Sequence, residues 1–484
     1  MMNSAFSVRL IWFFLVLIIS AGCFIQDVRA SDYQPVPGVV DLRSTFSDGA
    51  YDINSLVQLA RSKGIQALFI NDHDLMAMEY GIWPLRNLIR KREERNSILK
   101  MGADKYISEI ERVSQANPDM IIIPGSETTP FYHWTGSPFQ GKLTAHNHEK
   151  RILIVGLESA SDYENLPILH NDHSVRILRS NLPGVLFFSV AFLAGLVMIR
   201  WKGPFRIAGM VVVVLSAVLM ANSTPFRKSP FDPYHGDQGR APYQLLIDYV
   251  AARGGMTFWN YPETKSGVRQ LGPIMVSTRP YPEALLESRG YTGFASLYGE
   301  NITVTEPDGI WDMVLKEYCS GLRQRPPWGI ATADFHREGE DGEQLGNYPT
   351  VFYVKEKKKA DILGALRNGR MYAARGRFPE IPVMDEFSVS SADGTVKGIS
   401  GEDVSLTGHP RIKIALSSSK PVTGQVKVRL IRSGSVVHSV EGTLPLQIEY
   451  VDAYFNPGEK IYYRMDMRGA GIIVSNPIFV NFLK

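Results

Sequence analysis

The sequence predicts an α/β protein that carries an inserted membrane hairpin and ends in an all-β domain. Three patterns indicate this: short apolar strands alternate with amphipathic helices from residue 39 onward, two uncharged apolar runs lie near the middle, and strand patterning replaces helices after residue 379. At 484 residues the chain is too long for one ordinary domain. Its formal charge of +3 is too small to indicate a nucleic-acid partner, and we expect none.

The α/β pattern is clearest at the start of the large domain, which we place at residues 31–382. Ile53, Leu56, Val57 and Ala60 recur at helical spacing and predict a helix that ends near Gly64. The apolar stretches predicted as strands are residues 67–70, 120–124, 151–157, 256–260 and 328–333. Polar residues follow several of these strands, where parallel α/β barrels place their chemistry.

Residues 182–199 and 207–221 contain no charged side chain. A membrane-spanning helix needs about 17–25 apolar residues, so the first run qualifies and the second is marginal. The alternative is a buried helical pair in a soluble core. Arg200, Lys202 and Arg206 crowd the short connection, and the positive-inside rule puts such a connection in the cytoplasm. We therefore expect a membrane hairpin within residues 176–230, with the main domains on the extracytoplasmic, periplasmic side of a bacterial cell membrane.

The first 30 residues resemble an export signal, because Arg9 precedes a short apolar run over residues 10–19. Three outcomes are open: cleavage after Ala30, lipidation of Cys23 in a lipobox-like Ala-Gly-Cys, or retention as a signal anchor. All three place the rest of the chain outside the cytoplasm.

Five polar motifs follow the predicted strands in order. They are Ser-Thr-Phe-Ser-Asp-Gly at 44–49, Asp-His-Asp at 72–74, Pro-Gly-Ser-Glu at 124–127, Asn-Tyr-Pro at 260–262 and Asp-Phe-His at 334–336. Their order and spacing resemble the PHP (polymerase and histidinol phosphatase) family of metal-dependent phosphoesterases. The resemblance implies a distorted TIM-like (β/α)7 barrel, interrupted by the hairpin.

The resemblance also implies a metal centre. Asp48, His73 and His336 match the residues that jointly hold one metal in the family, Glu127 matches a bridging carboxylate, and Asp334 matches a further ligand. Carboxylates and neutral imidazoles are suitable ligands for Mn, Fe or Zn. Such ions can activate a water molecule and bind phosphate oxygens.

The chain departs from the family at three positions. Asp41 and Arg43 stand where the family has a His-x-His pair, and Asn260 stands in place of a further histidine. A guanidinium cannot ligate a metal, whereas Asp41 can. We expect Arg43 to supply the positive charge of a missing ion by pairing with Glu127 and Asp334, or to hold a phosphate directly. We therefore expect one or two divalent ions instead of three, with Arg43 and Asp334 as the candidate catalytic residues.

His146 and His148 follow Glu127 in a region where the family often has a ligand histidine. Either could complete a second metal, and the alternative for each is a histidine of a surface loop. The charged run at residues 90–95 is predicted to lie on a polar, solvated helix.

The C-terminal domain, residues 383–484, is predicted to be a small β-sandwich. Its expected strands are residues 386–390, 411–416, 425–431, 446–451 and 460–467.

Two functions follow from these features. The first is a metal-dependent phosphoesterase at the membrane surface, with a small phosphate ester or a phosphorylated envelope component as substrate. The second is an inactive PHP-like pseudoenzyme that binds a ligand or acts as a scaffold. The oligomeric state is not predicted.

Overall fold

A computed structural model describes residues 33–169, 178–223, 229–300, 302–421 and 424–484. The predicted export segment, including Cys23 and Ala30, lies outside these residues. Within the described part, contacts group Gln34–Lys484 into one unit.

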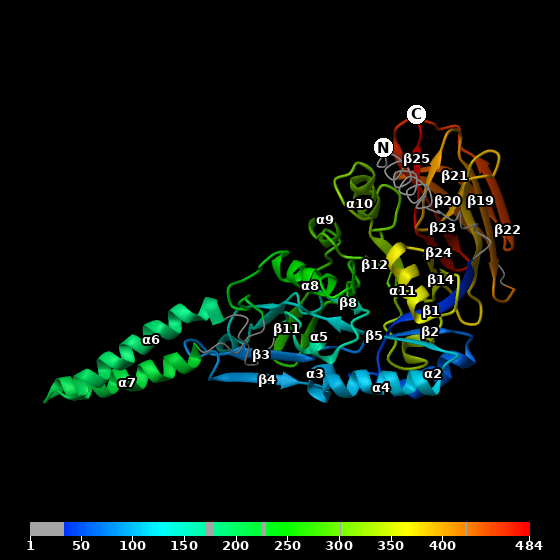
Figure 1. Ribbon diagram of the computed structural model, residues 1–484. Coiled ribbons are helices and arrows are strands. Elements are labelled where there is room, and N and C mark those ends of the chain that lie inside the picture. Colours follow the sequence, from blue (N-terminus) through cyan, green and yellow to red (C-terminus); the bar gives the residue numbers. More distant parts are fainter. Residues whose placement is uncertain (1–32, 170–177, 224–228, 301, 422–423) are drawn as a thin grey trace, which may run out of the picture. The chain divides into compact units, whose positions relative to one another are not determined.

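The predicted α/β class is confirmed, and a large mixed sheet runs through this unit (Figure 1). Its first strands, in spatial order, are β13 (Trp328–Ala331), β12 (Gly293–Leu297), β9 (Met256–Trp259), β8 (Ile152–Val155), β5 (Ile121–Thr128), β2 (Ala67–Ile70), β1 (Gln34–Leu42), β14 (Thr350–Val354) and β15 (Met371–Arg375). The sheet continues through β24 (Ile472–Ser475), β23 (Lys460–Gly469), β20 (Val426–Arg432) and β21 (Ser435–Gly442), while β25 (Ile478–Phe482) pairs with β23 and with β18 (Asp403–Leu406).

Strand direction determines which strand ends lie at the same edge of the sheet. β1, β2 and β5 are parallel, β8 is antiparallel to both β5 and β9, and β9, β12 and β13 are parallel. The C-terminal ends of these six parallel strands and the N-terminal end of β8 therefore lie at one edge. The chain after β13 also returns to β1, because Phe335 N donates to Asp41 O at 3.1 Å and Phe335 O accepts from Arg43 N at 3.0 Å.

The helices that follow these strands pack with apolar faces against the sheet. The predicted helix is present as α2 (Ile53–Ser62), and its predicted face is buried. Asp52 caps it by accepting from Ser55 N at 2.7 Å. The other helices outside the apolar hairpin are α3 (Ile98–Met101), α4 (Ala103–Ala116), α5 (Ala160–Glu164), α8 (Ala241–Ala251), α9 (Ala284–Glu287), α10 (Ile310–Cys319) and α11 (Lys359–Asn368).

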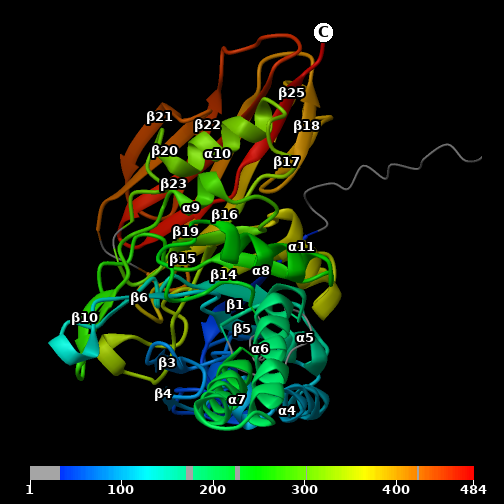
Figure 2. The same ribbon diagram turned by 90° about the vertical axis from the view of Figure 1, so that its left-hand side faces the viewer.

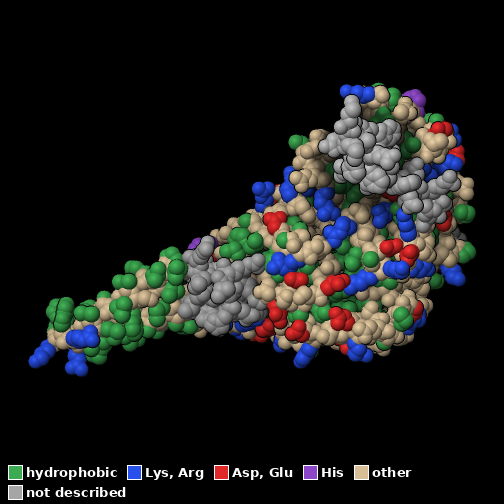
Figure 3. Space-filling view, viewed as in Figure 1, with side chains coloured by type: hydrophobic (Ala, Val, Ile, Leu, Met, Phe, Trp, Pro, Cys, Tyr) green, Lys and Arg blue, Asp and Glu red, His purple; other side chains and the backbone are tan. Residues whose placement is uncertain are grey.

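The two central apolar runs form α6 (Leu178–Ile199) and α7 (Pro204–Asn222), which pack as a pair (Figures 1 and 2). Both are long and apolar enough to cross a membrane, and their spanning windows are only 6% and 11% buried. The pair packs closely at two glycines, since a Cβ on Gly209 would lie 2.8 Å from Gly195 O. Green apolar side chains cover the pair in Figure 3, and basic side chains lie at its free end.

Two smaller sheets are separate from the large sheet. β3 (Ala77–Gly81) and β4 (Arg90–Glu94) form an antiparallel hairpin, so the prediction of a helix over residues 90–95 is wrong. Cross-strand ion pairs between Glu79 and the arginines of β4 suit this strand, because opposite charges on neighbouring strands attract. The second sheet consists of β10 (Val268–Leu271), β11 (Ile274–Ser277), β7 (Thr144–His146) and β6 (His133–Thr135). A short 3-10 helix, η2 (Pro138–Gln140), joins β6 and β7.

The predicted C-terminal strands are present. β16 (Pro382–Ser390), β17 (Lys397–Ile399), β19 (Arg411–Ser418) and β22 (Leu446–Val451) form a four-stranded sheet, while β20 and β23 belong to the large sheet. Apolar side chains from both sheets share one core, which is distinct from the core around β1, β2 and β5.

Candidate functional site

Arg43 is the centre of a buried ion-pair cluster just beyond β1. Its Nη1 donates to Asp41 Oδ1 and to Asn71 O, the latter at 2.5 Å. Its Nη2 lies 2.7 Å from Glu127 Oε2 and 3.2 Å from Asp334 Oδ1. The side chain is fully buried, and a guanidinium in that position requires such partners because an unpaired buried charge is very costly. We call Arg43, Asp41, Glu127 and Asp334 the Arg43 cluster.

The backbone at this edge adopts conformations that only a well-supported site maintains. Asp41, Tyr261 and Asp334 have φ values of 75°, 45° and 47°, and they are three of the six non-glycine residues with positive φ in the described chain. The register between β1 and β2 also shifts between Val39 and Leu42. Such irregularities re-aim side chains next to functional sites, and here they bring Asp41 and Arg43 together.

Asn260 and Tyr261, just after β9, donate further hydrogen bonds to the cluster. Asn260 Nδ2 donates to Asp41 Oδ2 at 2.9 Å and to Glu127 Oε1 at 2.7 Å. The Tyr261 hydroxyl also donates to Asp41 Oδ2. Asn260 therefore presents a hydrogen-bond donor where the family presents an imidazole, and an amide N–H is not a metal ligand.

Arg151 is a site residue that sequence reasoning missed. Its Nη1 donates to Glu127 Oε2 at 2.6 Å, and its Nη2 donates to Glu149, which also accepts from Arg269 at 2.6 Å. The residue directly precedes β8, whose antiparallel direction brings it to the same edge as the ends of β1 and β5. The sequence shows that Arg151 precedes an apolar run, but it does not show that the strand formed by this run is antiparallel to β5.

The two guanidinium groups change the acidity of the carboxyls they contact. Burial would raise the pKa of Glu127, but Arg151 and Arg43 lower that pKa to about 2. At Asp41, burial outweighs Arg43 and raises the pKa to about 6. Glu127 is therefore a firmly ionised partner of both arginines.

Asp72 organises the loop that carries Asp48. Its carboxylate accepts from the Ser44 amide at 2.8 Å and hydroxyl at 2.6 Å, and from the Ser47 amide at 3.1 Å and hydroxyl at 2.5 Å. The loop then turns so tightly that a Cβ on Gly49 would lie 2.2 Å from Arg43 O, which explains the glycine there. Asp72, the first aspartate of the Asp-His-Asp motif, thus anchors the loop at Ser44 and Ser47 and does not face the site.

Asp74 also stabilises the local structure through hydrogen bonds. It accepts from Thr128 Oγ1 at 2.7 Å and from Leu75 N at 2.7 Å, and burial raises its pKa to about 7. His73 lies between the two anchored aspartates, and its position is set by both of them.

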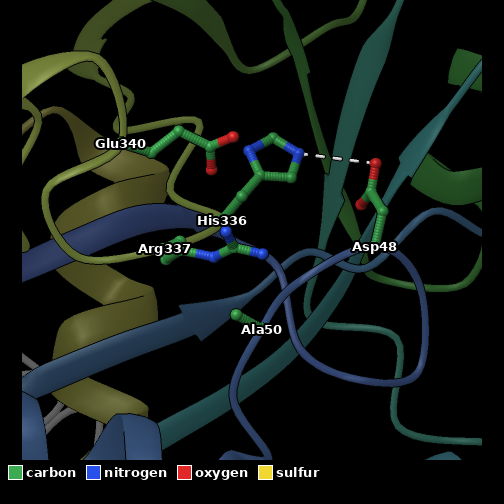
Figure 4. A pocket seen from close by; sticks show the side chains of 5 residues that line it. All are labelled: Asp48, Ala50, His336, Arg337 and Glu340. Carbon is green, nitrogen blue, oxygen red and sulfur yellow. Dashed lines mark ion pairs between the residues drawn. The ribbon is translucent and has the colours of Figure 1, made fainter.

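A second cluster brings together Asp48, His73 and His336, and we call it the Asp48 cluster. Asp48 Oδ2 lies 3.6 Å from His73 Nε2. The same oxygen lies 3.5 Å from His336 Nε2, the contact drawn as a dashed line in Figure 4. Burial would raise the pKa of Asp48, but His336 and His73 hold it well below its usual range. Burial opposes the charged form of His336 as well, yet Asp48 raises its pKa to about 8. His336 Nδ1 lies 2.8 Å from Asp334 O, which orients the ring.

Glu127 links the two clusters. Its Oε2, the oxygen that contacts Arg43 and Arg151, also lies 3.3 Å from His73 Nδ1.

Asp48 and His336 of this cluster line a polar cavity of about 270 Å³. The cavity is lined by Asp48, Ala50, His336, Arg337 and Glu340, and Figure 4 shows the Arg337 guanidinium beside His336. An exposed guanidinium next to the His336 imidazole is a suitable contact for a phosphate oxygen.

The two clusters differ in how well they fit a metal ion. In the described residues, no group of three or more His, Cys, Asp or Glu side chains is placed so that it could hold an ion as it stands. The donor types of Asp48, His73 and His336 nevertheless fit one divalent ion. Ligands at the usual bond lengths on a tetrahedral ion lie about 3.4 Å apart, close to the separations from Asp48 Oδ2. In the Arg43 cluster the guanidinium already pairs with the carboxylates, and the residues do not fit an ion.

His146 and His148 lie apart from both clusters in their contacts. His146 Nε2 lies 2.7 Å from Thr135 Oγ1 and its ring stacks on His133 at 4.9 Å. His148 Nδ1 lies 3.7 Å from Glu149 Oε1, so it approaches the Arg43 cluster only through Glu149 and Arg151.

Comparisons with known proteins give few matches. No family model matches the chain, and none of the curated proteins matches it. A solved two-domain protein from Bacteroides vulgatus ATCC 8482, described as containing a predicted PHP-like metal-dependent phosphoesterase, is 11% identical with a TM-score of 0.38; the match covers 90% of this chain and 91% of that one. A solved protein from Bifidobacterium adolescentis ATCC 15703, described as a proposed metal-dependent phosphoesterase, is 15% identical with a TM-score of 0.28 over 64% of this chain and 90% of that one. At such low identity and TM-score, neither neighbour determines the function of this chain.

Proposed function

We propose that this chain is a membrane-tethered hydrolase of phosphate esters. Its site would use one divalent ion together with the buried guanidinium of Arg43. The observation that carries the proposal is the approach of two imidazole nitrogens to one oxygen of Asp48 at the wall of a cavity that also contains Arg337. Asp48, His73 and His336 would hold the ion, which is Mn, Zn or Fe. When bound there, the ion would act as a Lewis acid on a phosphoryl oxygen and lower the pKa of a water molecule.

The chain's own residues divide the remaining tasks. Arg337 would orient the phosphate, because a guanidinium matches the spacing of two phosphate oxygens. Arg43 would supply part of the charge of a second ion by pairing with Asp41, Glu127 and Asp334. Half of the Asp334 side chain is exposed, and it would accept a proton or a hydrogen bond from the substrate side. Asp41, Glu127, His146 and His148 would then have no direct contact with the ion.

We extend the proposal to the architecture and the compartment. The hydrogen bonds between Phe335 and β1 support closure of β1, β2, β5, β8, β9, β12 and β13 into a distorted (β/α)7 barrel. The core shared by two C-terminal sheets supports a β-sandwich-like domain. The basic connection between α6 and α7 supports a cytoplasmic loop, with both domains on the periplasmic side of a bacterial membrane.

The substrate class follows from the site and the tether. A small polar cavity suits a phosphomonoester or a compact phosphodiester, either as a small molecule or as an exposed group of an envelope component. A long duplex partner is not expected, because the formal charge of the chain is only +3.

A second candidate function is a pseudoenzyme that binds a ligand or acts as a scaffold. The observation that favours it is the pairing of Glu127 Oε2 with both Arg43 and Arg151, while Oε1 accepts from Asn260, so that both oxygens of this carboxylate already have protein donors.

One experiment separates the two functions. The full chain, purified in detergent, is assayed with Mn or Zn on aryl phosphate monoesters and diesters, beside His73→Ala and His336→Ala. Hydrolysis that falls with both substitutions supports the enzyme, with the exposed His235→Ala as a matched control that keeps full activity. Absence of hydrolysis, or hydrolysis that is indifferent to both substitutions, supports the binding protein.

A further inference from the structure

The connection between β3 and β4 exposes large apolar side chains on a short segment. Ile82, Trp83, Leu88 and Ile89 are 39%, 75%, 47% and 51% exposed. We call residues 82–89 the β3–β4 tip. Water contact on four such side chains within eight residues is unfavourable, and a patch of this kind usually marks a contact surface.

Hydrogen bonds fasten this tip to the end of α7. Asn87 N donates to Asn222 Oδ1 at 3.0 Å, Asn87 Nδ2 donates to Asn222 O at 2.6 Å, and Asn222 Nδ2 donates to Pro84 O at 3.2 Å. Asn222 is the last residue of α7, where the apolar span ends. The tip is therefore at the level at which a membrane-spanning α7 would leave the hydrocarbon core.

The tip is also held from the side of the large domain. The Arg86 guanidinium lies 4.0 Å from the centre of the Tyr234 ring, and Gly81 N donates to the Tyr234 hydroxyl at 2.5 Å. Trp134 Nε1 donates to Glu79 O at 2.9 Å. The hairpin that carries the tip thus connects the end of the apolar helix to the body of the protein.

The chemistry of the tip matches the interfacial layer of a bilayer. Tryptophan is enriched at this depth because its ring is apolar while its N–H needs a polar partner. Residues 82–92 contain Arg86, Arg90, Lys91 and Arg92 and no Asp or Glu. Arg90, Lys91 and Arg92 pair in part with Glu79, Glu93 and Glu94, so attraction to anionic headgroups would add to apolar insertion without dominating it.

We propose that the β3–β4 tip is a second membrane contact, which inserts Trp83 and its apolar neighbours into the interfacial layer of the bilayer that α6 and α7 cross. The inference rests on the membrane tether of the proposed function, and it adds a lateral attachment that a two-helix tether lacks. Two attachments at different points restrict rotation of the large domain about the helical hairpin. The candidate site would then have a defined orientation towards a membrane-borne substrate.

The test measures how deeply the tip lies in lipid. The full chain, with Cys23→Ala and Cys319→Ser, is reconstituted into vesicles of phosphatidylcholine and phosphatidylglycerol. Spin labels are placed one at a time at Trp83→Cys, Leu88→Cys, Leu193→Cys in α6 and Leu322→Cys. Leu322, which follows α10, is an apolar residue that is 76% exposed, close to the 75% of Trp83. For each label, the collision rate with oxygen, which concentrates in lipid, is measured beside the collision rate with a water-soluble nickel complex.

The expected result is an oxygen-to-nickel collision ratio at positions 83 and 88 that is shifted from the Leu322→Cys value towards the Leu193→Cys value. Ratios at both tip positions equal to that at Leu322→Cys, with a lipid value at Leu193→Cys, would overturn the inference and leave the tether intact. Protection of the tip labels from both reagents would also overturn it, because a protein partner or a second copy would then cover the tip. A water-like value at Leu193→Cys would overturn the tether itself and the inference with it.

Discussion

The Arg43 cluster and the Asp48 cluster are linked through Glu127, but their charges are balanced in opposite ways. In the first, a fully buried guanidinium contacts three carboxylates, and Arg151 reinforces Glu127 from the other side. In the second, one carboxylate and two imidazoles approach each other beside a cavity, with donor atoms 3.5 and 3.6 Å apart. The first cluster is closed by protein cations, whereas the second has ligands that a cation could still bring together. The difference shows that one edge of a sheet can place a cluster whose charge is balanced by arginine beside a cluster whose donor types fit a metal ion.

The largest expected effect comes from removing the protein cation. Arg43→Met leaves Asp41, Glu127 and Asp334 close together without their shared partner, and breaking a buried ion pair in this way costs about 3–5 kcal/mol of unfolding free energy. Thermal or urea unfolding of the full chain in detergent would measure the loss. Arg61→Met is the matched control, because Arg61 pairs with Asp119 at the surface, and it is expected to unfold like the parent. A parent-like stability of Arg43→Met would contradict the closed character of the first cluster.

The next effect tests the open cluster. His336→Ala removes one of three proposed ligands, and we expect binding of Zn or Mn to weaken by about 100-fold or more, which exceeds the usual effect of losing an outer-shell partner. Titration calorimetry with the metal alone measures this without any substrate. Unfolding free energy should change little, because His336 is partly exposed. Equal metal binding by the parent and His336→Ala would show that the proposed ion does not bind at this site.

The smallest effect concerns the loop that presents Asp48. Asp72→Asn keeps the shape of the side chain but weakens its hydrogen bonds to Ser44 and Ser47. We expect metal binding to weaken by about 10-fold, as for other residues that orient a ligand. The same calorimetric titration applies, with the surface substitution Asp119→Asn as control. A loss as large as that of His336→Ala would mean that Asp72 contributes more than the position of the loop.

Much of the local structure could be predicted from residue patterns. The face of α2, the strands β2, β5, β9 and β13, and both apolar helices follow from hydrophobic periodicity and length. The charged run at residues 90–95 was misjudged because charge alone does not distinguish a solvated helix from an edge strand. Its strand is stabilised by pairing with β3, to which residues 82–89 connect it in a hairpin.

The arrangement of the Arg43 cluster could be predicted only in part from the sequence. That Arg43 could not ligate a metal follows from its chemistry, and its partners Glu127 and Asp334 follow from the order of the motifs. Arg151 could not be predicted, because its place depends on the antiparallel direction of β8. The same limit applies to the tip at residues 82–89, whose contact with Asn222 joins segments 135 residues apart.

The sequence by itself therefore determined which side chains are available for chemistry and which helices are apolar enough for a membrane. These properties depend on residue type and on spacing along a single element. The tertiary structure alone decided that two guanidinium groups share Glu127, and that Asp72 anchors the loop that carries Asp48. The reason is physical: strand direction, backbone irregularity and burial bring distant residues together, and those long-range contacts set the charge that each carboxyl carries.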